Sequence, residues 1–175
     1  MIHLVFDRIA SQIKVFDSAN HSLIFSWGAS GDATGNGPMP PGHFILLEPE
    51  AFPQDQWDPP TGWGRVRIRD MSDTDVQRLT AAGIAKSAAG GLDVGGTVLP
   101  PGACNAYERV IEIHGGGSAL GTPGCFAKQQ RLCHTLGCTR MHNEDVASLI
   151  SCMQQLQVSN TFIFSAFGTP AKCNC

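Results

Sequence analysis

The sequence predicts a mostly β protein with one or two short helices and long loops. Short runs rich in β-branched and aromatic residues alternate with polar turns, and only two stretches have helix-capping patterns. The 20 glycines and 11 prolines among 175 residues favour turns over long helices. A chain of this length suits one compact domain, residues 1–175, and it has no internal repeats.

The strand candidates are short β-rich segments bounded by turns. They cover residues 2–6 (IHLVF), 11–17 (SQIKVFD), 22–27 (SLIFSW), 43–48 (HFILLE), 65–70 (RVRIRD), 107–117 (YERVIEIHGGG, ending in a glycine-rich turn) and 161–167 (TFIFSAF). Residues 28–42 and 52–64 are too rich in glycine and proline for regular structure and are predicted as loops. In the second loop, Trp57 and Trp63 are expected to cover the sheet or to line a groove.

The two helix candidates begin at capping residues. Residues 71–83 have Ser72 as N-cap, Asp75 completing a capping box and Gly83 as the stop. Residues 143–156 (NEDVASLISCMQQL) begin at Asn143 as the cap, with acidic residues in the first turn, where the helix dipole favours them. Residues 88–96 are rich in glycine and predict a loop or a hairpin.

Charge and cysteine content limit the classes of function. The net charge is −3 with scattered Lys and Arg, so no nucleic-acid partner is expected, and no apolar run reaches membrane-spanning length. Seven cysteines, all between Cys104 and Cys175, indicate an oxidising compartment, and their odd number leaves at least one thiol free. The first residues do not form a signal peptide. We therefore expect that a leader was removed or that a secretion system delivers the protein.

Residues 131–145 (RLCHTLGCTRMHNED) concentrate the reactive side chains. One interpretation is a disulfide from Cys138 to Cys133 or Cys125, which the pattern alone leaves about as probable as a reactive thiol. Another is a zinc site formed by Cys125, Cys133, His134 and Cys138, but their spacing matches neither paired CxxC nor CxxC…HxxxH, so no metal is expected.

The third interpretation is a nucleophilic cysteine. Cys138 follows Gly137 and lies near Arg140 and the start of a predicted helix, which should bias the thiol toward thiolate. His114 ends an apolar strand candidate before three glycines, and pairing it with Cys138 would give a Cys–His acyl-transfer site. The alternative is that His114 has only a structural role, because a lone histidine in a turn more often just has its hydrogen bonds satisfied by neighbouring groups. Gly137 would let backbone N–H groups face a developing oxyanion.

The segments "IHGGG" and "TLGCTRMHNEDVASL" resemble the signature of the L,D-transpeptidases of the YkuD type. That signature is a His-Gly pair, then Ser/Thr-His-Gly-Cys-x-Arg-Leu/Met, then Asn-x-Asp opening a helix. The resemblance extends to "SQIKVFDSANHSLIFSWGASG" and "GPMPPGHFIL" and so covers most of the chain, and it implies a YkuD-like β-sandwich or barrel. The specific block matches at Gly137, Cys138, Arg140, Met141, Asn143 and Asp145.

The resemblance implies roles for these residues. Cys138 would be the nucleophile and His114 the general base, with a backbone carbonyl near Gly115 or Gly116 orienting the imidazole. Gly137 and Cys138 would supply oxyanion-hole N–H groups.

The resemblance also implies a substrate-binding group. Arg140 would hold a substrate carboxylate, for which a guanidinium is well suited. Thr135 falls at the family's Ser/Thr position. Thr135, Gly116 and Asn143 are the other expected members of the substrate-binding group. Asn143 and Asp145 are also expected to cap the helix and fix the loop.

The chain departs from the family in two places. Leu136 stands where the family commonly has His, and His134 is interpreted as solvated. The segment between His114 and Cys138 contains "GTPGC", which makes Cys125 a rival nucleophile, although it lacks the Arg-Met-x-Asn-x-Asp continuation. A Cys125–Cys133 bridge is expected in this segment, and a bridge from the C-terminal cysteines to Cys152 or Cys104.

The resemblance implies acyl transfer on peptidoglycan tetrapeptide stems by a cysteine nucleophile, without a cofactor. The outcome would be 3→3 cross-linking, D-amino acid exchange or D-alanine removal, in the periplasm or cell wall. A variant is an effector toxin, whose partners would be a secretion machinery and an immunity protein. The alternative from another class is an inactive, disulfide-stabilised cell-wall-binding module, because fold does not fix function.

Overall fold

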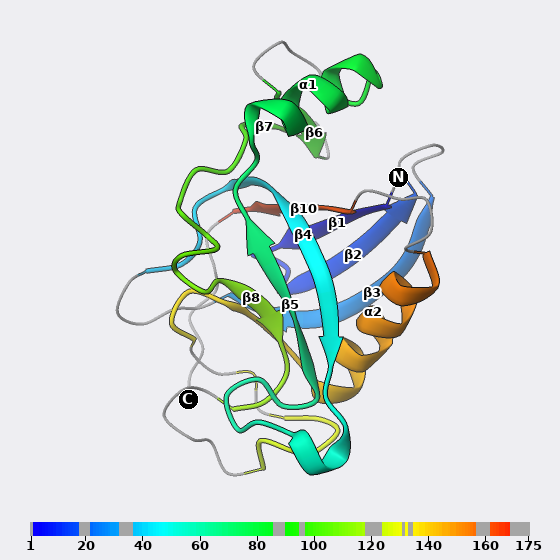
Figure 1. The fold of residues 1–175 in the computed structure, drawn as a ribbon, viewed down its shortest axis with the longest axis vertical. Helices are drawn as coiled ribbons and strands as arrows, with labels where there is room; N and C mark the ends of the chain where they lie inside the picture. The colour runs from blue at the N-terminus through cyan, green and yellow to red at the C-terminus, as the bar shows by residue number, and fades with distance from the viewer. Residues whose placement is uncertain are drawn as a thin grey trace.

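The computed structural model describes residues 2–17, 22–31, 37–85, 90–94, 97–117, 124–130, 132, 135–156 and 162–168. Eight of its strands form a closed barrel (Figure 1). They are β1 (Ile2–Asp7), β2 (Gln12–Asp17), β3 (Leu23–Ser30), β4 (Gly42–Ala51), β5 (Gly64–Arg69), β8 (Glu112–His114), β9 (Thr139–Met141) and β10 (Phe162–Phe167). Around the barrel the order is β1-β10-β4-β5-β8-β9-β3-β2. The prediction of a mostly β barrel with one or two helices is confirmed.

Successive side chains along each strand point to opposite faces of the sheet, so one set packs inside the barrel and the other packs outside it. In β1, Leu4 and Phe6 are buried in the barrel core, whereas Val5 packs outward against a smaller cluster. Helix α2 (Asn143–Leu156) closes the core with its buried apolar residues, which are Val146, Leu149, Ile150 and Met153 on one face. The 3.6-residue period of a helix brings these four positions together, so α2 lies against β4 and β5.

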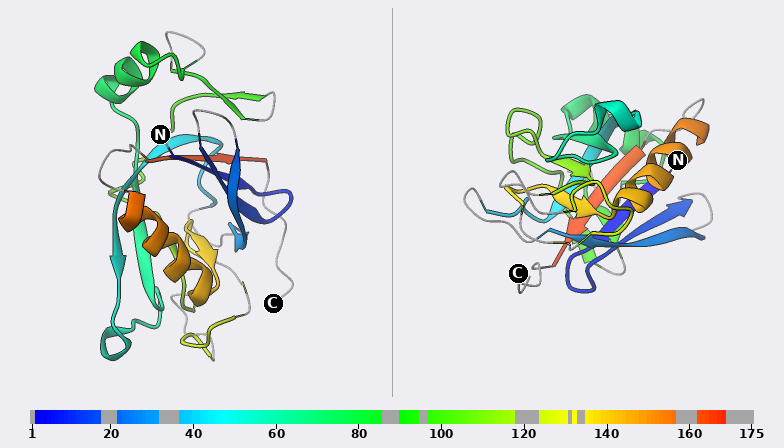
Figure 2. Two further views of the ribbon diagram at one scale, coloured as in Figure 1. Left: turned by 90° about the vertical axis from the view of Figure 1, so that its right-hand side faces the viewer. Right: turned by 90° about the horizontal axis from the view of Figure 1, so that it is seen from below.

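A small outer layer stands at one end of the barrel (Figures 1 and 2). It consists of helix α1 (Asp73–Ala81) and the hairpin of β6 (Leu92–Val94) and β7 (Thr97–Leu99). Leu79 and Leu92 pack on Ile163 of β10. The predicted capping box between Ser72 and Asp75 is present, and the hairpin confirms one of the two forms expected for residues 88–96.

Two strand predictions differ from the structure. Only Glu112–His114 of the predicted strand 107–117 is extended, because the preceding residues form a turn with Val110 at a φ of 54°. Strand β9 lies in a segment for which no strand was predicted, because three residues are too few to show a period in the sequence. A short 3₁₀ helix, η1 (Gln54–Gln56), lies in the predicted loop 52–64.

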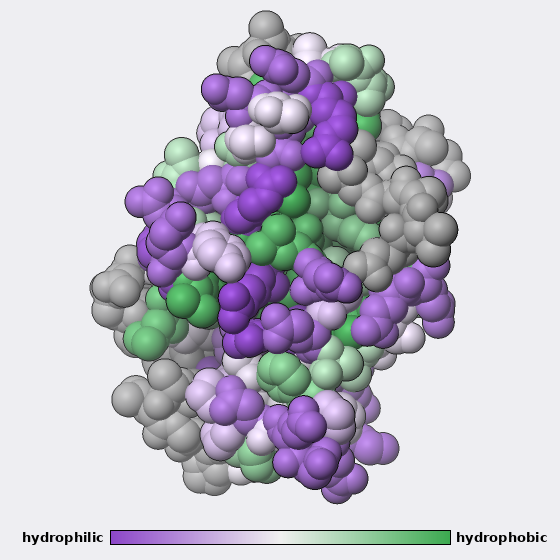
Figure 3. Space-filling view, viewed as in Figure 1, coloured by the Kyte–Doolittle hydropathy of each residue, from purple (hydrophilic) through white to green (hydrophobic). Residues whose placement is uncertain are grey.

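The surface in the view of Figure 1 is largely hydrophilic, with apolar residues gathered in a hollow near its middle (Figure 3). None of the helices described is both long enough and apolar enough to span a bilayer.

Candidate functional site

Strands β8 and β9 bring the two motif segments side by side. They pair in parallel, with Ile113 opposite Thr139 and His114 opposite Arg140. Because side chains alternate along strands, Ile113 faces the core while His114 and Arg140 share the other face. Continuing the same register places Cys138, the residue before β9, opposite Glu112.

The His114 imidazole is buried and held by the backbone beside it. Its Nδ1 lies 2.6 Å from the Gly115 carbonyl oxygen, and since a carbonyl only accepts, Nδ1 carries the proton. Burial lowers the pKa of His114 to about 4, and the charge of Arg140 lowers it too, while the backbone carbonyls of Gly115 and Pro60 and the charge of Asp58 raise it. At neutral pH the ring is therefore uncharged, with Nε2 as its basic nitrogen.

The Cys138 thiol is half-buried and protonated at neutral pH. It donates to the Val110 carbonyl, with a Sγ–O distance of 3.5 Å. Burial raises its pKa to about 11 and outweighs the hydrogen bond from the Glu112 backbone and the charges of Arg140 and Arg109, which lower it; the Glu112 carboxylate also raises it. The predicted bias toward thiolate is wrong in this structure. Among the described residues, no hydrogen bond joins this thiol to His114.

The turn before β9 is fixed by Thr135. Its hydroxyl donates to the Cys138 carbonyl at 2.8 Å and accepts from the Gly137 N–H at 3.2 Å. Gly137 has a φ of 123°, and a Cβ there would lie 2.9 Å from Ile111 Cδ1. The Gly137 N–H expected in an oxyanion hole is thus engaged inside the turn. The neighbouring Leu136 is 54% exposed.

Arg140 lies inside the protein. Its side chain is fully buried, beside His114 in the strand register. Its charge lowers the pKa values of both His114 and Cys138. A substrate carboxylate cannot reach this guanidinium in the conformation described, so the role implied by the resemblance is not available to it there.

Asn143 holds three loops together instead of capping α2. The first turn of α2 is closed by the His142 carbonyl, which accepts from Val146 N–H at 2.9 Å. The Asn143 Oδ1 accepts from the N–H groups of Gly116 at 2.9 Å and Trp63 at 3.2 Å. Its Nδ2 donates to the Cys125 carbonyl at 2.9 Å and the Ala127 carbonyl at 2.6 Å. The predicted capping role is wrong, and the amide has no capacity left for a substrate.

The glycines around this amide leave no space for side chains. A Cβ on Gly115 would lie 2.2 Å from Asn143 Oδ1, and one on Gly62 2.0 Å from the same atom. Gly116 has a φ of 71°, and a Cβ there would lie 2.4 Å from the Gly62 nitrogen. The glycine run after His114 therefore serves close backbone packing that orients the imidazole.

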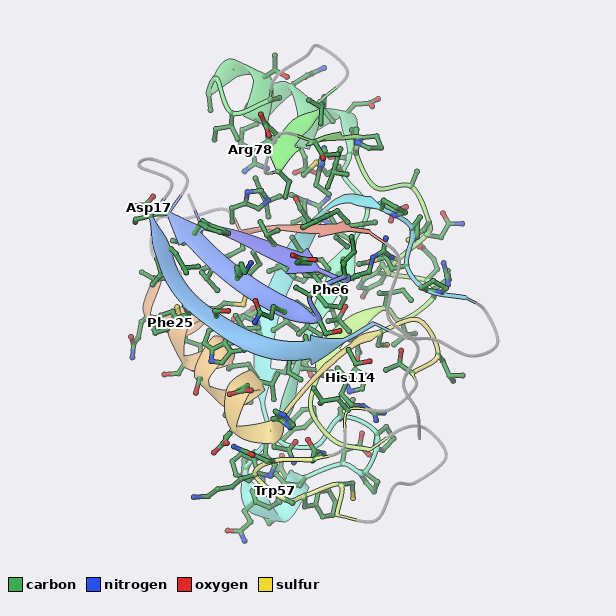
Figure 4. The ribbon with its side chains drawn as sticks, turned by 180° about the vertical axis from the view of Figure 1, so that it is seen from behind. Phe6, Asp17, Phe25, Trp57, Arg78 and His114 are labelled. Atoms are coloured by element: carbon green, nitrogen blue, oxygen red, sulfur yellow. The ribbon has the colours of Figure 1, made fainter. Side chains whose placement is uncertain are left out.

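The predicted loop tryptophans form an aromatic cluster, and Trp57 lies below His114 in the view of Figure 4. Trp57 and Trp63 stack with ring centroids 4.7 Å apart, and Trp57 also contacts Phe126 at 5.8 Å. Trp63 Nε1 donates to the Phe126 carbonyl at 3.1 Å. The cluster joins loop 52–64 to the segment that contains Cys125.

Several cysteine predictions fall outside the described residues. Cys104, Cys125, Cys138 and Cys152 are free thiols in the structure. The expected bridges, from Cys125 to Cys133 and from the C-terminal cysteines to Cys152 or Cys104, are therefore not formed in the structure; Cys133, His134 and the C-terminal cysteines lie outside the described residues. Within the described ranges, no group of three or more His, Cys, Asp or Glu side chains is placed to hold a metal ion.

Comparison with known proteins gives similarity of structure only. No protein-family model and no curated protein sequence matches the chain. The structure of Bdellovibrio bacteriovorus Bd1075 is similar with a TM-score of 0.52 and 12% identity, over 95% of this chain and 47% of that chain. The chain thus spans about half the length of that protein, and at this identity the similarity shows a shared fold.

Two further solved structures have lower TM-scores. One is Mycobacterium tuberculosis L,D-transpeptidase 1, with a TM-score of 0.43 and 14% identity over 95% of this chain and 61% of that chain. The other is the helical cell shape determining protein Pgp2 from Campylobacter jejuni, with a TM-score of 0.48 and 15% identity over 98% of this chain and 49% of that chain.

Sequence reasoning missed three residues that face Cys138. The Glu112 backbone lowers the pKa of the thiol by a hydrogen bond while its carboxylate raises it, Arg109 lowers it, and the Val110 carbonyl accepts a hydrogen bond from the thiol. All three precede His114 in a segment predicted as a plain strand. The charged pair Glu108 and Arg109 beside apolar Val110 interrupts strict alternation, and this was the available signal.

Proposed function

We propose that the chain is a cysteine-dependent acyl transferase of the L,D-transpeptidase type that acts on peptidoglycan stem peptides. The observation that carries this proposal is the parallel pairing of β8 and β9, which brings the His-Gly and Gly-Cys-x-Arg segments together. The contact of His114 Nδ1 with the Gly115 carbonyl supports it, because it leaves Nε2 as the base.

In the first half-reaction the thiol attacks the carbonyl carbon of the third residue of a tetrapeptide stem. Because the thiol of Cys138 is protonated, its proton passes to His114 Nε2 as the S–C bond forms. Collapse of the tetrahedral intermediate breaks the C–N bond. The leaving D-alanine amine takes the proton back from His114, and a thioester remains on Cys138.

The second half-reaction returns the enzyme to its starting state. An acceptor attacks the thioester carbonyl, loses a proton to His114 Nε2, and expels the Cys138 sulfur, which regains a proton. An amine from a second stem gives a 3→3 cross-link, a D-amino acid gives exchange, and water gives the tripeptide. The aromatic cluster of Trp57, Trp63 and Phe126 is the proposed wall of the acceptor side.

Mass spectrometry of muropeptides incubated with the protein tests this function. Wild type should consume tetrapeptide stems, whereas Cys138→Ala and His114→Gln should leave them unchanged. Circular dichroism of both variants checks that they are folded. If wild type leaves tetrapeptides unchanged, L,D-acyl transfer is not the function.

A cell-wall-binding module without catalysis is the second candidate. The protonated thiol and its hydrogen bond to Val110 favour it, since this thiol is not activated at rest. It predicts that wild type and Cys138→Ala bind purified peptidoglycan equally and that a carbapenem forms no adduct. A carbapenem adduct that maps to Cys138 would favour the enzyme.

We place the activity in the periplasm or cell wall, either in a housekeeping enzyme or in a delivered effector toxin. Expression in a Gram-negative host with and without an exported leader separates the two. A toxin should arrest growth only when exported, and Cys138→Ala should relieve the arrest. A neighbouring gene for a periplasmic immunity protein would support the effector. If active protein is exported and the host grows normally, this result would count against the effector toxin.

A further inference from the structure

The guanidinium group of Arg109 lies beside the turn that precedes Cys138. Arg109 is half-buried, and its Nη2 would lie 3.4 Å from a Cβ on Gly137, the residue before the cysteine. The same Nη2 lies 3.5 Å from the Gly37 carbonyl, and the guanidinium also hydrogen-bonds the Cys104 sulfur. Three loops thus meet at this side chain, those containing Gly37, Arg109 and Gly137.

The loop that presents Arg109 is held in a strained conformation. Asn105 and Val110 have φ angles of 53° and 54°, and a β-branched residue in this region is a rare outlier. The Arg109 N–H donates to the Asn105 carbonyl at 2.9 Å, and the Ile111 N–H to the Ala106 carbonyl at 2.8 Å. These bonds fix the direction in which Arg109 leaves the backbone. The same strained turn aims the Val110 carbonyl at the Cys138 sulfur.

Neighbouring arginines are less suited to meet a ligand. Arg140 is fully buried. Arg65 and Arg67 lie 3.4 Å and 3.5 Å from the buried Glu112 carboxylate, and both also approach Glu50. Arg109 combines positive charge, partial exposure and contact with the nucleophile turn, which Arg140 does not.

We infer that Arg109, and not Arg140, binds a substrate carboxylate beside Cys138. The inference rests on the proposed acyl transfer for the identity of the substrate. The ligand class is a peptide carboxylate next to the scissile bond, which either the terminal D-alanine or the side chain of a diamino-dicarboxylic third residue supplies. A guanidinium suits this group because it can donate two parallel hydrogen bonds.

Alkylation of Cys138 tests the anion site without any enzyme activity. Iodoacetate and iodoacetamide form the same S–C bond and release the same iodide, but only iodoacetate is anionic. The ratio of their rates at Cys138, followed by peptide mapping, should fall about 10-fold in Arg109→Gln and recover partly in Arg109→Lys. The matched control is Arg78→Gln, because Arg78 lies on α1 at the far end from His114 (Figure 4).

Substrate variants then identify which carboxylate is bound. For wild type, kcat/KM on a stem ending in D-alaninamide, or on one with lysine as third residue, is compared with the parent stem. The change that removes the bound carboxylate should lower kcat/KM about 10- to 100-fold, mainly through KM, and should have no further effect in Arg109→Gln.

The outcomes separate this inference from the proposed function. An alkylation ratio that falls only in Arg109→Gln supports the anion site, even if stems are not processed and acyl transfer fails. A ratio unchanged from wild type overturns the inference. The inference is also overturned if wild type is active and both carboxylate changes lower kcat/KM as much in Arg109→Gln as in wild type.

Discussion

Replacing Asn143 by alanine should strongly destabilise the fold around the candidate site. The fully buried amide makes four hydrogen bonds, to Gly116, Trp63, Cys125 and Ala127. Alanine removes all four and leaves two N–H groups and two carbonyls without these partners. At about 0.5–1.5 kcal/mol net for each bond, the loss is about 2–6 kcal/mol. That is a large part of the roughly 5–15 kcal/mol that stabilises a typical domain.

Urea unfolding followed by tryptophan fluorescence measures this loss. Gln129→Ala is the matched control, since it removes an exposed bond to Glu144 in the same region and should change stability by less than about 0.5 kcal/mol. A third variant, Asn143→Asp, keeps the acceptor for Gly116 and Trp63 but sets a carboxylate against two carbonyls. Relative to wild type at the same pH, it should be least stable at neutral pH and should recover in acid. A loss below about 1 kcal/mol for Asn143→Ala would refute this account of the loops.

Three further predictions concern the dyad and its glycines. Alkylation of Cys138 by iodoacetamide should accelerate about tenfold per unit between about pH 7 and 9, because its pKa is raised to about 11, whereas a preformed thiolate–imidazolium pair gives a flat profile. Gly116→Ala should lower the melting temperature well beyond Gly83→Ala, since both have φ near 70° but only Gly116 is closely packed, and equal shifts would contradict the packing. Because burial lowers the pKa of His114 to about 4, its contribution to stability is complete above pH 6.5 and is lost as the pH falls toward 4. Acid titration of unfolding should show a shallower decline for His114→Gln, and an identical decline would exclude this residue as a cause.

Local signals predicted much of the fold. The Ser72 capping box lies within four residues of chain and depends on nothing else, so helix α1 could be located from the sequence. Strand β9 could not, because it is extended only through pairing with β3 and β8, which are distant in the chain. Asn143 shows the same limit, since its position fits a cap while its partners come from three distant loops.

The candidate site was predictable as a set of segments but not as an electrostatic environment. The positive charge near Cys138 is visible in the sequence as Arg140. The contributions that raise the pKa of Cys138 are not visible in the sequence. The Glu112 carboxylate is brought to the thiol only by the pairing of β8 and β9, and burial is a property of the folded chain. The sign of the pKa shift at Cys138 is set by burial, its largest cause, and the prediction from neighbouring residues alone was wrong.

The thiol contact with Val110 sets an order of events for the proposed reaction. In the conformation described, the Cys138 sulfur is directed to the Val110 carbonyl and not to His114. The thiol must therefore leave that carbonyl before its proton can pass to Nε2. Arg109 precedes Val110 in the same strained turn, so a substrate carboxylate bound there would pull on the backbone that holds the thiol. Substrate binding at Arg109 would then come first, release of the thiol second and proton transfer to His114 third, which keeps the thiol protonated and unreactive until a substrate is in place.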